Sequence, residues 1–378
     1  MSVYLDCNAT TPIDPMVRDA VAKYLEDEFG NAGSRTHEYG ARAKQATEHA
    51  RRQVASVVAA DPQDVVFTSG ATESNNLAIL GLAEHGIQKG KKHIVTSAIE
   101  HKAVLEPMER LQQQGFSVTV LPVGQSGAVE VEAVLDAVRE DTLLISLMHA
   151  NNETGVIQPI EQLIKALPED GPFLHIDAAQ TFGKVMQALS DPRVDLISVS
   201  AHKVFGPKGI GALVNRRRDR KRVPLQPLMV GGGQERGMRP GTLPVHLIVG
   251  LGEASEQASK NADVRSEQCE QIREGLIKVL DDLGAKFHGD QSLVMPHVFN
   301  CSIPGVDSEA AMLALKGNIA ISNGSACTSA SYTPSHVLEA MGLSEDEIEG
   351  AMRFSWCHLT PNADWEELVG TPLRRLIA

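Results

Sequence analysis

Residues 194–214 read VDLISVSAHKVFGPKGIGALV, and they place a single lysine, Lys203, between two apolar runs. The run before it (196–199) has the composition of a buried strand, and Gly206 follows in a segment where the backbone can approach a ligand closely. An amine enclosed in this way can lose its proton and act as a nucleophile. A lysine that extends from a strand end into solvent would show the same pattern. The rest of the chain decides between these interpretations.

Similar apolar runs recur before and after Lys203 and alternate with helical patterns, which begin at about Glu73 and Lys102. The runs cover residues 64–69, 92–98, 117–122, 142–150, 172–178, 195–201 and 209–215. This alternation predicts an α/β fold with a largely parallel sheet covered by helices.

A second, smaller domain is predicted from the change of pattern after Gly231–Gly233. The sequence becomes long and helical from about Val245 to Leu283. It continues through a strand at 297–303, a helix at 308–316 and a strand at 352–356.

The composition is that of a globular protein with a large core. The chain has 378 residues, 42% of them hydrophobic, and a formal net charge of −13. This charge argues against wholesale binding to nucleic acid or to an anionic membrane. The dense basic run at 215–222 is interpreted as a solvated turn, with a docking site for an acidic partner as the alternative.

The cysteines and the N-terminus point to a reducing cytoplasm. The five cysteines are odd in number, scattered and without a C-x-x-C pair, so no disulfide framework or zinc site is indicated. The chain begins with a strand-like segment rather than a basic and apolar leader, and no stretch is long enough to span a bilayer.

Polar residues that follow the apolar runs are the candidates for a site, because ligands of parallel sheets bind at the carboxyl ends of the strands. The segment Gly70–Asn76 has small residues that open a helix and could leave backbone N–H groups free for a phosphate, although an ordinary helix start looks alike. His101 and Asp177 follow two other strands. The histidine alone is also compatible with a structural role.

His175 and Asp177 share one face of a strand, a placement that would allow both side chains to bind one metal ion. No third ligand stands at a suitable spacing, so we expect no metal. A buried carboxylate paired with a protonated ring nitrogen fits Asp177 better.

Lys203 and Asp177 together match what pyridoxal phosphate needs, an amine for a Schiff base and an acid beside the pyridinium nitrogen. At this point the chain resembles the class V aminotransferase superfamily and, within it, the NifS/IscS-type cysteine desulfurases. The resemblance runs nearly end to end through YLDCNATTP, SGATESNN, EHKAV, HANNETG, HIDAAQ, SAHKVFGPKGIGAL, GGGQERGMRPGT and NGSACTSAS.

The resemblance implies the aspartate aminotransferase-like fold of pyridoxal-phosphate-dependent transferases. In it, a large domain with a mainly parallel seven-stranded sheet is joined to a smaller α+β C-terminal domain. The expected division is an N-terminal segment at 1–15 that packs with the small domain, a large domain at 16–245, and a small domain at 246–378 that carries the catalytic cysteine.

The resemblance also implies roles for single residues. Lys203 corresponds to the Schiff-base lysine, Asp177 to the acid on the pyridine nitrogen, and His101 to the ring that stacks on the cofactor and moves protons. Gln180 and Asn152 resemble the groups at the phenolic oxygen, and Asn152 is also placed near the substrate carboxylate. The residues that match the phosphate pocket are Ala71, Thr72, Ser200 and His202, with Thr242 reaching into the partner subunit's site of a homodimer.

Arg353 and Cys327 complete the implied machinery. Arg353 corresponds to the arginine that clamps the substrate carboxylate, although a surface ion pair would be the ordinary role of an arginine. Cys327 lies among small polar residues that could not hold a fixed packed structure, so we expect a mobile loop with a reactive thiol.

The implied reaction removes sulfur from L-cysteine, leaving alanine and a persulfide on Cys327 that passes to an acceptor protein. The family supplies iron–sulfur cluster assembly, tRNA thiolation and DNA phosphorothioation, and direct nucleic-acid binding is not expected. Two alternatives stay open: a selenocysteine lyase or other class V aminotransferase in which Cys327 is incidental, and a scaffold that binds partners through 216–222.

The sequence departs from the family pattern in two places. Gly30–His37 has an insertion and no proline, and Ser355–His358 is bulky where relatives carry a small turn. Cys357 is interpreted as a packed residue, with a second accessible thiol as the alternative.

Overall fold

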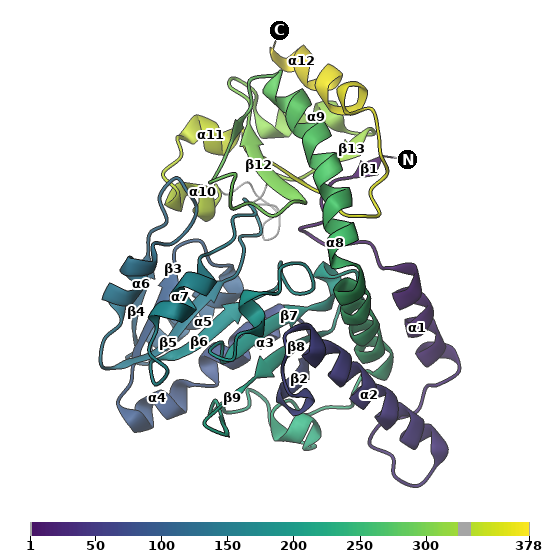
Figure 1. Cartoon of the computed structure of the whole chain (residues 1–378), viewed down its shortest axis with the longest axis vertical. Coiled ribbons are helices and arrows are strands. Elements are labelled where there is room, and N and C mark those ends of the chain that lie inside the picture. The colour runs from purple at the N-terminus through teal and green to yellow at the C-terminus, as the bar shows by residue number, and fades with distance from the viewer. Residues whose placement is uncertain (1, 324–333, 378) are drawn as a thin grey trace.

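A seven-stranded sheet forms the centre of the larger part of the molecule, as the computed structural model shows for residues 2–323 and 334–377 (Figure 1). Its strand order is β2-β8-β7-β6-β5-β3-β4, and strands β4, β3, β5, β6 and β7 run parallel. Strand β8 is antiparallel to both of its neighbours, β7 and β2. The predicted α/β fold with a mainly parallel sheet is therefore confirmed. The strands are β2 (Val65–Thr68), β3 (His93–Ser97), β4 (Ser117–Leu121), β5 (Thr142–Met148), β6 (Phe173–Asp177), β7 (Leu196–Ser200) and β8 (Gly211–Asn215).

Helices cover both faces of this sheet, which explains why its inner strands read as continuous apolar runs. Alternate side chains enter two separate cores: Ile145 belongs to one, and its neighbour Leu144 belongs to the other. The helices around the sheet are α1 (Pro15–Glu26), α2 (Glu38–Val57), α3 (Ala71–Leu80), α4 (Ala83–Lys89), α5 (Lys102–Gln112), α6 (Val131–Ala137) and α7 (Ile160–Ala166).

Helix α8 (Val245–Asp281) links the two parts of the molecule. It packs beside α1 and α2 at its start and reaches the second sheet at its end (Figure 1). Ile248 contributes to the first core and Leu276 to the second. The helix is interrupted by non-helical backbone at Asn261.

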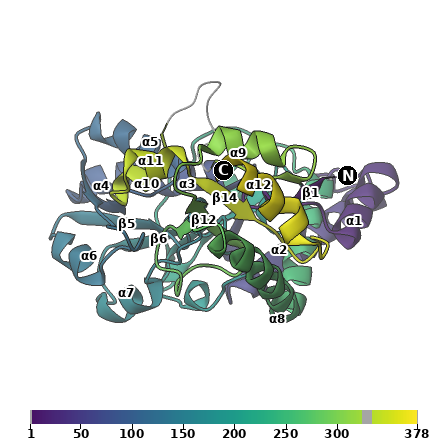
Figure 2. The ribbon, with the colours of Figure 1, turned by 90° about the horizontal axis from the view of Figure 1, so that it is seen from above.

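The second sheet is antiparallel, with order β11-β12-β14. Helices α9 and α12 pack against each other beside this sheet (Figure 2). The N-terminal strand β1 (Val3–Tyr4) pairs with β13 (Ile319–Ala320) in this part of the chain, while the domain boundaries themselves remain a prediction. The other elements are β11 (Lys286–Phe287), β12 (Val298–Ser302), α9 (Ser308–Leu315), α10 (His336–Ala340), α11 (Glu345–Glu349), β14 (Met352–Ser355) and α12 (Thr371–Ile377).

The glycine-rich segment 231–237 is fixed to the large sheet by a buried ion pair. Both carboxylate oxygens of Glu235 accept hydrogen bonds from Arg51, at 2.7 and 2.8 Å, and one also accepts from the backbone N–H of Phe67. Both side chains of the pair are at most 4% exposed. Arg51 also contacts Glu48, whose side chain is 48% exposed.

Replacing Glu235 by glutamine is expected to lower the free energy of unfolding by about 3–5 kcal/mol, because it leaves the Arg51 charge buried without its main partner. Glu48→Gln removes only the exposed contact and should cost less than about 1 kcal/mol. Urea unfolding of the two variants, followed by circular dichroism, measures both values. Similar losses for the two variants would contradict the assigned role of the buried pair.

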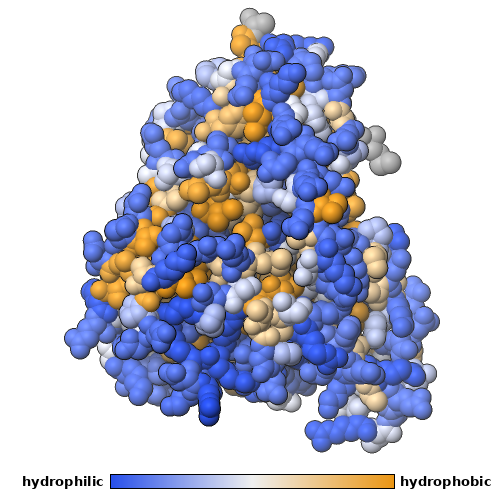
Figure 3. All heavy atoms as spheres, in the orientation of Figure 1, coloured by the Kyte–Doolittle hydropathy of each residue, from blue (hydrophilic) through white to orange (hydrophobic). Residues whose placement is uncertain are grey.

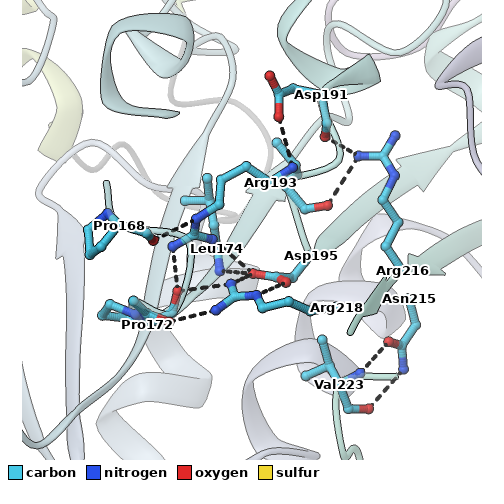
Figure 4. Close-up of polar contacts among 12 residues, drawn as sticks. Pro168, Pro172, Leu174, Asp191, Arg193, Asp195, Asn215, Arg216, Arg218 and Val223 are labelled. Carbon is cyan, nitrogen blue, oxygen red and sulfur yellow. Dashed lines mark hydrogen bonds and ion pairs between the residues drawn. The ribbon is translucent and has the colours of Figure 1, made fainter. Parts of the chain in front are cut away.

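The basic run at 215–222 forms a hairpin of β9 (Arg217–Arg218) and β10 (Lys221–Arg222), and it corrects the interpretation as a solvated turn. Arg216 is 6% exposed and donates to the carbonyl oxygens of Asp191, Val194, Leu189 and Val58. Figure 4 shows the bond with Asp191. Arg218 forms an ion pair with buried Asp195 (Figure 4). Four helix-end and loop carbonyls need donors there, and Arg216 supplies them. Counting charges along the sequence does not reveal this requirement.

Arg217 and Arg222 also form ion pairs with Asp64. These intramolecular contacts weaken the hypothesis of a scaffold that binds acidic partners through this run. Of the run, Arg217, Asp219, Arg220 and Lys221 are exposed.

The surface shows apolar residues in small separate groups among hydrophilic ones on the face seen in Figure 3. Within residues 2–323 and 334–377, no helix combines the length and the apolar character that crossing a bilayer requires.

Candidate active site

A cavity of about 520 Å³ lies at the carboxyl ends of strands β5, β6 and β7. Most of the predicted site residues, which come from five separate segments of the chain, line it together. They are Ala71, Thr72, His101, Asn152, Asp177, Gln180, Ser200, His202 and Lys203. This is the edge of the sheet at which ligands of parallel α/β folds bind.

Lys203 reaches the cavity from the short turn Ala201–Lys203 that follows β7. Its Nζ donates to the carbonyl oxygens of Asn8 and Ala9, the second at 2.9 Å. Asn8 in turn donates from Nδ2 to the Asn152 carbonyl at 3.1 Å and accepts from Gln180 Nε2 at 3.1 Å. The N-terminal segment is therefore a wall of the cavity.

Asp177 ends strand β6 with its side chain at the cavity, and the residue is 6% exposed. Its two carboxylate oxygens accept from Asn75 Nδ2 at 2.7 Å and from the backbone N–H of Ala179 at 2.9 Å. These donors hold the carboxylate in one orientation and compensate part of its burial. A cationic group bound in the cavity could therefore form an ion pair with the Asp177 carboxylate.

His101 caps the start of helix α5, where its Nδ1 accepts a hydrogen bond from the backbone N–H of Ala103 at 3.0 Å. Burial lowers the pKa of His101, against the attraction of the Asp177 carboxylate. An accepting Nδ1 in a neutral ring places the hydrogen on Nε2. The ring is thus held in one tautomer at the cavity wall.

Helix α3 begins at the cavity without a side-chain cap. Gly70 stands at its N-cap position with φ at 151° and makes no side-chain cap. The N-terminus of a ten-residue helix without a side-chain cap suits a phosphate. Ser200 and His202 lie at the same place, and burial lowers the pKa of His202 to about 4, so its ring is neutral at pH 7.

These groups fit pyridoxal phosphate. The cavity offers an amine, a fixed carboxylate, a flat ring and a helix start, which are the four partners that this cofactor uses. The Oε1 atom of Gln180 is buried and has no hydrogen-bond partner among the described residues, so an acceptor is available in the same wall.

Two predicted residues lie outside the cavity wall. Thr242 is exposed and does not line this cavity. Arg353, in β14, is fully buried and donates to Asp6 at 2.7 Å and to the Asn152 carbonyl at 3.1 Å, one layer behind the wall. Its Nε atom has no hydrogen-bond partner among the described residues.

Cys327 lies outside the described residues. The Gly30–His37 segment connects α1 and α2, and none of it lines the cavity. Trp356, Cys357 and His358 line a different, smaller cavity.

His175 occupies the middle of β6 rather than a metal site. Its two ring nitrogens are engaged by the hydroxyls of Ser146 and Ser198, at 2.8 and 2.9 Å. Burial lowers its pKa to about 3, so the ring is neutral at pH 7. The described residues contain no cluster of three or more His, Cys, Asp or Glu side chains that could hold a metal ion.

Asn8 and Asn75 belong to the site but were not predicted as site residues. Both stand inside the quoted motifs YLDCNATTP and SGATESNN, which was the only signal available. Their partners lie far away in the chain, so the contacts could not be derived from spacing. Lys208 and Gly209 also line the cavity.

Comparison with known proteins gives consistent matches. The family model described as aminotransferase class-V matches residues 3–368. The cysteine desulfurase IscS of Vibrio cholerae is 45% identical over 367 residues, which cover 96% of this chain and 90% of that protein.

Two solved structures are similar over nearly their whole length. The crystal structure of DndA from Streptomyces lividans has 51% sequence identity and a TM-score of 0.82, covering 92% of this chain and 98% of that one. The structure described as SspA in complex with cysteine has 39% identity and a TM-score of 0.83, covering 94% and 98%.

Proposed function

The chain belongs to the class-V aminotransferase family as a cysteine desulfurase, and we propose that it uses Lys203 and Cys327 to pass the sulfur of L-cysteine to an acceptor. The observation that supports this proposal most strongly is that Lys203, Asp177 and His101 line one cavity. The cofactor that this family implies is pyridoxal phosphate.

The cofactor would be held at both of its ends by this chain. Asp177 would pair with the ring nitrogen, supported by Asn75, and His101 would lie against the ring. The phosphate would bind at the start of α3 with Ala71, Thr72, Ser200 and His202. When bound, pyridoxal phosphate supplies an electron sink for the bonds at the substrate α-carbon.

Lys203 would bind the cofactor at rest and then act as a base. When it is not bonded to the cofactor, its Nζ would remove the α-proton of L-cysteine. Asn8 and Ala9 accept from Nζ in the present structure and orient it toward the cavity. His101, held in one tautomer, would give and take protons through Nε2.

Cys327 would receive the sulfur. Its thiolate attacks the sulfur of the substrate, the carbon–sulfur bond breaks, and the carbon is protonated to give L-alanine. The balance is L-cysteine plus the Cys327 thiol giving L-alanine plus a Cys327 persulfide. An acceptor protein or thiol then takes the terminal sulfur.

Arg353 would bind the substrate carboxylate, together with Asn152. Its guanidinium contacts the carbonyl of Asn152, which lines the cavity, and its Nε has no partner among the described residues. Binding the substrate therefore requires the wall at Asn152 to open toward Arg353. The guanidinium must therefore donate hydrogen bonds to Asp6 and to the substrate at the same time. A guanidinium can do so because its five donors point in several directions.

Arg353→Lys is expected to raise the KM for L-cysteine by about 10–100-fold, because a hydrogen bond to a charged carboxylate contributes about 1.5–3 kcal/mol. The value of kcat should change much less, since the proton-transfer groups remain. Steady-state kinetics with L-cysteine measures both. A lower kcat with an unchanged KM would contradict carboxylate binding and indicate a structural role for the buried arginine.

We also propose a homodimer in which Thr242 completes the phosphate site of a second copy. The exposure of Thr242 and its absence from this chain's own cavity support this assignment. Its segment is tied to α3 by the ion pair of Arg239 with Glu73, at 2.9 Å.

The products of L-cysteine test the proposed function directly. In the presence of a reducing thiol, alanine and sulfide should appear in equal amounts. Pyruvate and ammonia in place of alanine would indicate an elimination, and selenocysteine turnover without cysteine turnover would indicate the lyase alternative.

A further inference from the structure

Two cysteines from opposite ends of the chain meet behind the active-site wall. Cys7 and Cys357 are 2% and 3% exposed and pack with Phe205 in one small cluster. The backbone brings them together, because Asp6 pairs with Ser355 in a parallel bridge and the N–H of Cys7 donates to the Ser355 carbonyl at 2.9 Å. The proposed reaction uses neither thiol.

The two thiols differ in their access to a second cavity. Cys357 lines this cavity of about 100 Å³, whereas Cys7 does not line it. This cavity is lined by the turn at Gly183–Val185, by helix α8 and by the chain that follows β14. Cys357 does not line the cofactor cavity. A small molecule in it would reach Cys357 first and Cys7 only through Cys357.

Basic side chains surround this second cavity. Lys184, Arg265, His297 and His358 line it together with the thiol of Cys269. The Lys184 amine lies 3.3 Å from Nε2 of His297, and Arg265 pairs with Asp14 at 2.8 Å. The Nη1 atom of Arg265 and the Nδ1 atom of His358 have no hydrogen-bond partner among the described residues. Burial lowers the pKa of His358 to about 4 and that of His297 well below its ordinary value, so both rings are neutral at pH 7. The charges of Lys184 and Arg265 therefore favour a negative charge in the cavity wall.

The contacts of the Cys357 sulfur favour its thiolate form. The neighbouring Cys7 thiol lowers the pKa of Cys357 to about 7, against the effect of burial. The Thr360 hydroxyl contacts the sulfur at 3.8 Å, and the Lys184 charge acts in the same direction. The same contact raises the pKa of Cys7, so Cys7 keeps its proton. Burial raises the pKa of Cys269 to about 12, so that thiol stays inert.

We propose that Cys357 and Cys7 form a redox-active pair, in which a small peroxide entering the second cavity oxidises Cys357 and Cys7 then closes an intramolecular disulfide. In the first step the Cys357 thiolate attacks one oxygen of hydrogen peroxide, the O–O bond breaks, and a sulfenic acid and hydroxide form. In the second step Cys7 attacks the sulfenic sulfur, the S–O bond breaks, and water leaves. The two cysteines lose two electrons, and the peroxide gains them.

The oxidised pair would act on the cofactor lysine. Cys7 is covalently joined to Asn8, and the Asn8 carbonyl accepts from Lys203 Nζ. A disulfide brings the two sulfurs from contact to bonding distance, about 2 Å, and so displaces the segment of the wall that contains Cys7 and Asn8. This second part rests on the proposed function, because it requires a cofactor bound through Lys203, whereas the disulfide does not.

The test uses the full-length holoenzyme as the Cys327→Ala variant, so that peroxide cannot act on Cys327. After treatment with hydrogen peroxide and alkylation of free thiols, peptide mass spectrometry should find one disulfide, between the Cys7 and Cys357 peptides, that dithiothreitol reverses. Adding either Cys7→Ala or Cys357→Ala should abolish this disulfide. Because two different variants give the same result, the test does not depend on the folding of one of them. Adding Cys269→Ala, which removes another thiol that lines the same cavity, should leave it unchanged.

Two results would overturn the proposal. One is a Cys357 that remains a free thiol at peroxide concentrations that oxidise an exposed cysteine of a control peptide. The other is a Cys357 oxidised to sulfinic acid while Cys7 stays reduced. The visible absorbance of the bound cofactor should shift as the disulfide forms, and a disulfide with an unchanged spectrum would overturn the coupling to Lys203. A reduced protein without any visible absorbance would instead contradict the proposed function.

Discussion

Replacing Lys203 by alanine is expected to remove both the colour of the holoenzyme and its desulfurase activity. The amine that binds the cofactor and the base that removes the substrate α-proton are proposed to be the same atom. General base catalysis alone contributes about 10²–10⁴-fold, so kcat should fall by at least about 10³-fold when covalent binding is lost as well. Visible absorbance of the purified variant and sulfide release from L-cysteine measure the two effects separately.

A second readout identifies the lysine independently of activity. Borohydride reduction of the wild-type protein should fix the cofactor covalently to the peptide that contains Lys203, and to no other lysine peptide. Lys89→Ala, an exposed lysine at the end of α4, serves as the control and should behave as the wild type. A yellow and active Lys203→Ala protein would refute the assignment.

Replacing Cys327 by alanine is expected to leave the colour intact and to abolish sulfide release. The partners proposed for the cofactor are other residues, among them Lys203 and Asp177, so cofactor binding should not depend on Cys327. Sulfur transfer needs a thiolate to accept the substrate sulfur, and no other side chain is proposed for this task. We expect sulfide release from L-cysteine to fall by about 10³-fold or more, as for removal of an essential nucleophile.

The neighbouring residue provides the matched control for this variant. Thr328→Ala changes the same segment without touching a thiol, so it should retain most of the activity. The spectrum of Cys327→Ala should still change when L-cysteine is added, because the steps before sulfur transfer remain possible. Full activity in Cys327→Ala would favour an aminotransferase or lyase in which this cysteine is incidental.

Much of the fold could be predicted because its signals are local. Each apolar run that leads into the site became a strand of the central sheet, and the residues after 92–98, 172–178 and 195–201 became its wall. Parallel topology explains this success, since it collects the carboxyl ends of consecutive strands at one edge.

The remaining parts of the site depend on contacts between distant segments. Asn75 holds Asp177 across 102 residues, and Asn8 meets Lys203 across 195 residues. Arg216 appeared as part of a charged turn, although it satisfies four backbone carbonyls in the interior. The residues around a buried acceptor do not indicate which distant side chain donates to it, so these roles can be assigned only from the structure.

The meeting of Cys7 and Cys357 has the same origin. Their pairing follows from a bridge between Asp6 and Ser355, and the sequence alone placed the two thiols in unrelated segments. Cys357 was expected to be a packed strand residue, and it is buried, yet it also borders a cavity.

The central claim is that the Lys203 chemistry delivers sulfur to Cys327. The most direct test is a single turnover of the wild-type protein with L-cysteine in the absence of reducing thiols, followed by mass spectrometry of the cysteine-containing peptides. The account predicts one additional sulfur atom on the Cys327 peptide and one equivalent of alanine. An unmodified Cys327 peptide together with a full equivalent of alanine would contradict it.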